Sequence, residues 1–131
     1  VLFVDGGCLG NQRTDMTTRW MYGVVTDPFG VVMTKFHERG GSNNIAELRA
    51  VKEALWWCRQ SAVRDVEIYT DSRVNLSWAL GRSPGDFIND RAAVLLLQKE
   101  IAEYSDIRWT LDWIPREQNV AGVYLEEHPP I

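Results

Sequence analysis

Cysteine, long apolar runs and positive charge are all scarce in this sequence of 131 residues. Its two cysteines, Cys8 and Cys58, are too few for a disulfide framework and lack the spacing of a metal site, so we expect a reducing, cytoplasmic environment. No apolar run approaches the roughly 18 residues of a membrane span, so we expect no membrane partner. The net charge of −4 disfavours nucleic-acid binding through bulk charge alone, but it allows local phosphate contacts around bound metal ions.

The composition that remains is that of an ordinary globular protein. Apolar residues make up 45% of the chain and charged residues 24%, which argues against disorder and against a fibre. The length suits one domain, and the chain contains no internal repeat, low-complexity tract or linker. We therefore predict a single domain over residues 1–131, and we expect it to act as a monomer.

Apolar periodicity and turn residues predict an α/β domain with the element order β-β-β-α-β-α-α-β-α. The first strand is expected to end at Asp5, where Gly6 and Gly7 begin a turn. Asn44 and Glu47 have the spacing of a capping box at the start of the first helix. Strands are predicted over 1–4, 20–26, 31–37, 66–70 and 107–114, and helices over 45–60, 71–80, 90–104 and 119–127.

Three acidic residues lie where these elements would deliver side chains to one edge of the sheet. Asp5 ends the first strand, Asp71 ends the fourth, and Glu47 lies in the first turn of the first helix. Alone, each has an ordinary structural explanation as a turn, helix-cap or helix-dipole residue. Together they form a self-repelling cluster that suits Mg²⁺ or Mn²⁺, and two such ions support phosphodiester hydrolysis.

The sequence resembles type 1 ribonuclease H, of the ribonuclease H-like superfamily, over nearly its whole length. Four segments carry the resemblance: Asp5-Gly6-Gly7-Cys8-Leu9-Gly10-Asn11, Asn43-Asn44-Ile45-Ala46-Glu47-Leu48, Tyr69-Thr70-Asp71-Ser72 and Pro115-Arg116-Glu117-Gln118-Asn119. The resemblance implies a five-stranded mixed sheet with helices on both faces. It also implies that Asp5, Glu47 and Asp71 are the first three carboxylates of an Asp-Glu-Asp-Asp metal site. The implied reaction is two-metal endonucleolytic cleavage of the RNA strand of RNA–DNA hybrids, with Mg²⁺ (or Mn²⁺), leaving 5′-phosphomonoesters.

The fourth acidic position departs from the family pattern. An ungapped comparison places Val123 where the family has aspartate, and valine cannot bind a metal. We favour Asn119, whose amide oxygen would complete the set if the preceding loop is shorter. Glu126, one helical turn beyond Val123, is the alternative fourth ligand, and a site of three acidic ligands plus water is a further possibility.

The resemblance also implies substrate contacts for several polar and glycine residues. Cys8, Gly10 and Asn11 match the loop that touches the RNA strand, and Asn43 and Asn44 match the turn that reads the minor groove of the hybrid. Further matches are Ser42 at a DNA phosphate, Arg73 at a phosphate and Arg116 in product release. The basic handle of the family is absent, so hybrid binding should be weak and sensitive to salt.

A second interpretation is a catalytically weakened or inactive module of the same fold that binds hybrids or a protein partner. Val123 at the fourth position supports this interpretation. The retention of Asp5, Glu47 and Asp71 opposes it, because a binding module gains nothing from uncompensated acidic repulsion.

Overall fold

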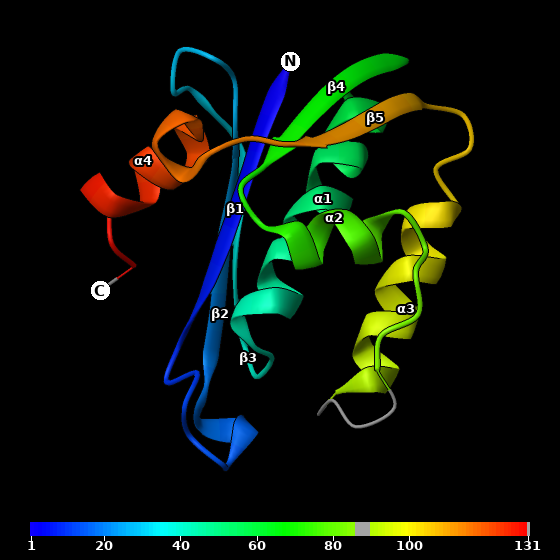
Figure 1. The fold of residues 1–131 in the computed structure, drawn as a ribbon. Helices are drawn as coiled ribbons and strands as arrows, with labels where there is room; N and C mark the ends of the chain where they lie inside the picture. The colour runs from blue at the N-terminus through cyan, green and yellow to red at the C-terminus, as the bar shows by residue number, and fades with distance from the viewer. Residues whose placement is uncertain (86–89, 131) are drawn as a thin grey trace.

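The computed structural model describes residues 1–85 and 90–130, and over these residues the chain forms a mixed sheet of five strands with four α-helices (Figure 1). The strands are β1 Leu2–Leu9, β2 Trp20–Thr26, β3 Val32–Arg39, β4 Asp65–Thr70 and β5 Arg108–Trp113. The helices are α1 Asn43–Gln60, α2 Arg73–Ala79, α3 Arg91–Ala102 and α4 Val120–Glu127, with 3₁₀ turns at Met16–Thr18 and Arg116–Gln118. The predicted fold class and element order are confirmed. No helix in the described ranges is long and apolar enough to cross a membrane.

The strands lie in the order β3-β2-β1-β4-β5, so the sheet has an antiparallel half and a parallel half. β1 pairs antiparallel with β2 and β2 with β3, whereas β4 lies parallel to both β1 and β5. The β2–β3 connection is a tight turn: the carboxylate of Asp27 accepts hydrogen bonds from the N–H groups of Phe29 and Val31. Gly30 completes the turn with a φ of +86°, a conformation that favours glycine.

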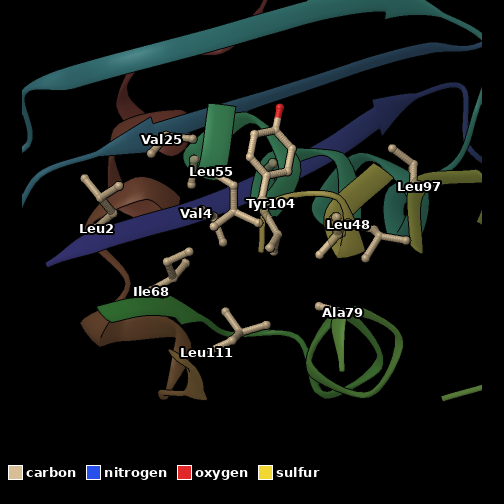
Figure 2. Close-up of a cluster of buried hydrophobic side chains, with 14 of the residues drawn as sticks. Leu2, Val4, Val25, Leu48, Leu55, Ile68, Ala79, Leu97, Tyr104 and Leu111 are labelled. Atoms are coloured by element: carbon tan, nitrogen blue, oxygen red, sulfur yellow. The ribbon is translucent and has the colours of Figure 1, made fainter. Parts of the chain in front are cut away.

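Helices cover the sheet on both sides (Figure 1): α1, α2 and α3 lie on one face, and α4 packs against β1 and β2 on the other. The main core lies on the α1 face, because alternate strand side chains point there. Figure 2 shows this cluster, in which fully buried side chains from strands and helix meet: Val4, Val25, Ile68, Leu48 and Leu55.

The first strand does not end at Asp5 as the sequence pattern predicts; β1 continues through both glycines to Leu9. These glycines serve close packing instead of a turn. A Cβ atom on Gly6 would lie 2.7 Å from the carbonyl carbon of Ala46, and one on Gly7 would lie 2.5 Å from the hydroxyl of Tyr22. The missing side chains therefore let the first turn of α1 approach β1 closely on one face and an aromatic ring lie flat on the other.

The sheet opens between β1 and β4 beside the midpoint of β1. These strands pair only at Leu2 with Ile68 and at Phe3 with Tyr69, and β4 ends one residue later. From this point β1 continues toward Leu9 while the chain after β4 turns into α2. Ligand sites of α/β sheets commonly lie at such carboxyl ends, where neighbouring connections depart in opposite directions.

Candidate active site

The opening between β1 and β4 holds the three carboxylates singled out in the sequence. Asp5 comes from β1, Glu47 from α1 just after its first turn, and Asp71 is the residue that follows β4. One oxygen atom from each side chain lies within 4.8 Å of the others, and all three residues are partly buried. The close contact of Gly6 with Ala46 holds the helix end in place, so Asp5 and Glu47 meet although they come from different elements.

Burial and like charge make this cluster difficult to ionise fully. Burial is the main cause that raises the pKa of Asp5 from 3.8 to about 6, and the carboxylate of Asp71 raises it further. Burial also raises the pKa of Glu47 from 4.5 to about 8, and the charge of Asp5 adds to that effect. The positive charge of Arg116 opposes the change at Asp5 but does not cancel it. The cluster therefore retains protons near neutral pH and is short of positive charge.

The donor set and the space around it fit a divalent cation. The carboxylates line a pocket of about 500 Å³, here called the acidic pocket, together with Gly122, Arg116 and Glu126. A Cβ atom on Gly122 would lie 3.3 Å from Oδ2 of Asp5 and 3.5 Å from Oδ2 of Asp71, so the glycine leaves these oxygen atoms accessible. Oxygen-only ligation is what Mg²⁺ and Mn²⁺ prefer.

Asn119 is fully buried beside the cluster, but its orientation differs from the ligand role expected of it. Its Nδ2 donates to the carbonyl of Val4 at 3.0 Å and to Oδ2 of Asp71 at 3.2 Å, while its Oδ1 accepts from the N–H of Ala121 at 3.2 Å. Because a carbonyl only accepts and a backbone N–H only donates, these partners fix the amide orientation. In this geometry Asn119 caps α4 and positions Asp71, and its oxygen atom faces the helix instead of the carboxylates.

The acidic pocket also meets α4 at a different position from the one the ungapped comparison selects. Val123 is 40% exposed, whereas the preceding Gly122 faces the carboxylates. Glu126 lies four residues after Gly122, on the same side of the helix, and lines the pocket. Its Oε1 lies 3.9 Å from Nε of Arg116, so this weak ion pair stands at the pocket mouth.

The predicted substrate loop is tied to the start of α1 by a chain of hydrogen bonds. The N–H of Asn43 donates to Oδ1 of Asn11 at 2.9 Å, and the N–H of Cys8 donates to Oδ1 of Asn43 at 2.7 Å. Asn44 is exposed, but Cys8 is buried and supports this loop instead of presenting its thiol. Gly10 adopts a φ of +74° at the loop's tight turn.

The cap of α1 is Ser42, not the expected capping box. Its hydroxyl accepts the N–H of Ile45 at 3.2 Å, and the side chain of Glu47 is directed to the acidic pocket. At the start of α2, the guanidinium of Arg73 lies 4.0 Å from the ring centroid of Trp113. Nε1 of Trp113 in turn donates to the carbonyl of Asp71 at 3.0 Å, so Arg73 is held near the cluster and remains exposed.

Sequence reasoning missed two residues that shape this region. Tyr22 lines the acidic pocket, and burial, with a contribution from Asp5, raises the pKa of its phenol. The pairing of Tyr22 with Gly7 was the available signal, since an aromatic residue opposite a glycine covers it. Arg19 is buried, and it donates from Nη1 to the carbonyl of Gly41 and from Nε to that of Arg13. No local pattern marked Arg19.

Replacing Asp5 by asparagine should stabilise the metal-free protein, and the gain should grow with pH. A carboxyl group whose pKa is higher in the folded than in the unfolded protein lowers the free energy of unfolding once the pH exceeds its unfolded pKa, and the loss is complete above its folded pKa. For Asp5 and Glu47 this range runs from about 4 to about 8. We expect a gain of about 1–3 kcal/mol at pH 8 and little at pH 4 in urea denaturation with a chelator present. The exposed Asp112→Asn is the control. Lower stability of Asp5→Asn at pH 8 would contradict this account.

The Asn119→Asp variant tests the positioning role of the amide. Aspartate caps a helix as well as asparagine does, so the cap is retained. The donor to Val4 is lost, however, and a carboxylate then faces Asp71. We expect the metal-free protein to lose about 1–3 kcal/mol in chemical denaturation. If Asn119 were a metal ligand, the variant would instead fold normally and bind Mg²⁺ more tightly.

Comparisons with known proteins place this geometry in a family. The family model for RNase H matches residues 1–122. Among solved structures, LC11-RNase H1, isolated from compost, is similar with a TM-score of 0.66 and 22% identity, covering 96% of this chain and 91% of that one. RNase H1 of Halobacterium salinarum is similar with a TM-score of 0.64 and 19% identity, covering 96% of each chain. The N-terminal RNase H domain of rv2228c from Mycobacterium tuberculosis is similar with a TM-score of 0.63 and 21% identity, covering 92% of this chain and 91% of that one.

A search of curated protein sequences gives no match. The structural similarities at these identities establish the fold, and the family model spans both the fold and the segments that supply the carboxylates. The chain therefore belongs to the RNase H family.

Proposed function

We propose that this chain hydrolyses the RNA strand of RNA–DNA hybrids as a metal-dependent endonuclease. The observation that carries the proposal is the convergence of Asp5, Glu47 and Asp71 in the acidic pocket of an RNase H fold. A similar solved structure, LC11-RNase H1 with a TM-score of 0.62 and 21% identity, is a complex with an RNA/DNA hybrid, which supports the choice of substrate.

Asp5, Glu47 and Asp71 would hold Mg²⁺ or Mn²⁺, and Glu126 is the remaining carboxylate that α4 directs to the same pocket. Two divalent ions bound at such a site would supply activation of water and stabilisation of the leaving oxygen, and departure of the 3′ oxygen would leave a 5′-phosphate product. Asn119 keeps Asp71 in position through its Nδ2. Because the chain's own groups hold protons at neutral pH, ion binding would displace them.

Substrate recognition is assigned to the amides around the start of α1. Asn11 and Asn43 are linked to each other, and the neighbouring Asn44 is exposed next to the pocket. Amide groups both donate and accept, so they suit a ribose 2′-hydroxyl and base edges in the minor groove. This chemistry favours the hybrid over duplex DNA. Gly10 shapes the loop that carries Asn11.

Phosphate contacts are assigned to the flanks of the pocket. Ser42, at the N-terminus of α1, and Arg73, stacked on Trp113, would each bind a backbone phosphate. Arg116 stands at the pocket mouth beside Glu126 and would draw the cleaved phosphate outward, which assigns it to product release. Few such cations surround the site, so hybrid binding should be weak, and its dependence on salt should be no steeper than these few phosphate contacts produce.

A module that binds hybrids without cutting them is the second candidate. One observation favours it: position 123, where the family pattern has an acidic residue, is a valine that is 40% exposed. The two functions differ in one measurable respect. An enzyme cleaves a labelled hybrid when Mg²⁺ or Mn²⁺ is added, whereas a binding module retains the intact hybrid.

The experiment is cleavage of an RNA–DNA hybrid labelled on the RNA, with matched duplex DNA and duplex RNA as controls. We expect metal-dependent cleavage of the hybrid only, and loss of cleavage in Glu47→Gln. Glu126→Gln should raise the metal concentration needed for half-maximal activity by roughly tenfold, as loss of a supporting group does. Glu127→Gln, on the adjacent helix position, is its control. Hybrid binding without cleavage under any of these conditions would establish the second candidate instead.

A further inference from the structure

A second cleft lies beside the acidic pocket, on the α4 face of the sheet. It has a volume of about 530 Å³ and runs between the outer surface of β2 and β3 and the C-terminal end of α4. Its side walls include Tyr22, Lys35, His37, Tyr124 and His128. No carboxylate lines it among the described residues, in contrast to the acidic pocket. We refer to it as the aromatic–basic cleft.

Strand pairing explains why cations and aromatic rings alternate here. Tyr22 of β2 lies opposite His37 of β3, and Val24 lies opposite Lys35, so these side chains share the outer face. Lys35 and His37 are exposed. At the far end of the helix, the rings of Tyr124 and His128 stack with their centroids 4.3 Å apart.

The same arrangement continues along the hairpin beyond the cleft. Trp20 lies opposite Arg39, and the Trp20 ring contacts the side chains of Arg39 and His37. The guanidinium of Arg39 lies 4.9 Å from the Trp20 ring centroid, and the His37 ring lies 5.0 Å from it. Aromatic faces and cations therefore form one strip along the exposed side of β2 and β3.

The aromatic–basic cleft is continuous with the acidic pocket. Tyr22, Leu125 and Pro129 line both, and Tyr22 and Asp5 lie on the same side of the sheet. A nucleic-acid strand that places a phosphate among the carboxylates can therefore pass over Tyr22 into a region of opposite charge. Proteins that bind unpaired strands combine a positively charged path with aromatic stacking surfaces.

We propose that the aromatic–basic cleft binds a single-stranded extension of the RNA strand, next to the paired segment in the acidic pocket. The identity of the strand rests on the proposed function, because the strand that continues from the carboxylates is the one being cut. The ammonium group of Lys35 would bind a phosphate, and the rings of Tyr124 and His37 would stack on bases. The volume lies within the roughly 300–1,000 Å³ of small-molecule sites, which is the scale of one or two nucleotides.

The test is fluorescence anisotropy of labelled nucleic acids with the parent protein and Ca²⁺ in place of Mg²⁺, so that a cation offsets the charge of the carboxylates while the strict octahedral geometry of Mg²⁺ is not supplied and nothing is cut. The ligands are a blunt hybrid and the same hybrid with an unpaired uridine extension at the 5′ or the 3′ end of the RNA. An extension at one of these ends should tighten binding by about fivefold or more, as stacking on aromatic residues does. The same extension made of DNA measures the contribution of the 2′-hydroxyls.

Lys35→Ser and Tyr124→Leu should each remove most of that gain and leave binding of the blunt hybrid unchanged. Lys35→Ser should also reduce the slope of log affinity against log salt by about 0.7, the value for one phosphate contact on a single strand. Lys99→Ser removes an exposed charge from α3, on the far side of the molecule, and should change nothing (Figure 1). Thermal unfolding of each variant is the control for correct folding.

Three results would overturn the proposal. The first is that neither extension tightens binding. The second is that Lys35→Ser and Tyr124→Leu weaken binding of the blunt hybrid as much as that of the extended hybrid, and the third is that the gain from the extension persists in both variants. An equal loss would mean that the duplex itself docks on this face. The outcome is separable from that of the proposed function. Tighter binding of the extended hybrid with no cleavage after Mg²⁺ addition would support strand binding in the aromatic–basic cleft and refute the proposed nuclease activity. Cleavage with no tighter binding of the extended hybrid would support the nuclease activity and refute the proposed strand binding.

Discussion

Three carboxylates share one partly buried opening between β1 and β4, and their mutual repulsion is the constraint around which the rest of the site is built. Because Gly6 has no side chain, α1 packs closely on β1 and brings Glu47 beside Asp5. The side-chain amide of Asn119 donates to both the carbonyl of Val4 and the carboxylate of Asp71, which holds Asp71 next to β1. These contacts hold together groups that would otherwise move apart. A fold that maintains such an arrangement is matched to a ligand of high positive charge, because a divalent ion relieves the repulsion that the backbone imposes.

Two neighbouring regions of one face differ in their polar groups: carboxylates line the acidic pocket, and Lys35 with two histidines lines the aromatic–basic cleft. The acidic pocket would hold cations that in turn attract phosphate, while Lys35 and His37 on β3 can meet phosphate directly. Tyr22 lies at the boundary and lines both. A net charge of −4 is compatible with the proposed nucleic-acid substrate, since attraction depends on where charge lies and not on its sum.

Local signals were sufficient for most of the fold. The Asp27–Gly30 turn and the periodicity of α1 depend on residues close in sequence, and the motif segments placed Asp5, Glu47 and Asp71 in their elements. Errors arose where a distant contact decides the outcome. Gly6 and Gly7 look like a turn until the backbone of Ala46 and the ring of Tyr22 are seen against them. The amide of Asn119 is oriented by Val4, which is 115 residues away in sequence. The rotation of α4, which turns Gly122 and not Val123 toward the pocket, is likewise set by packing.

Calorimetric titration of Mg²⁺ and Mn²⁺ into the protein at neutral pH tests the central claim most directly. Because burial and the charge of Asp5 raise the pKa of Glu47 to about 8, ion binding at neutral pH should be saturable and should release a proton from Glu47. This release appears as a dependence of the measured heat on the ionisation enthalpy of the buffer. Glu47→Gln should weaken binding and reduce the proton release. Absence of saturable binding, or binding that is unchanged in Glu47→Gln, would contradict the assignment of this cluster as a metal centre.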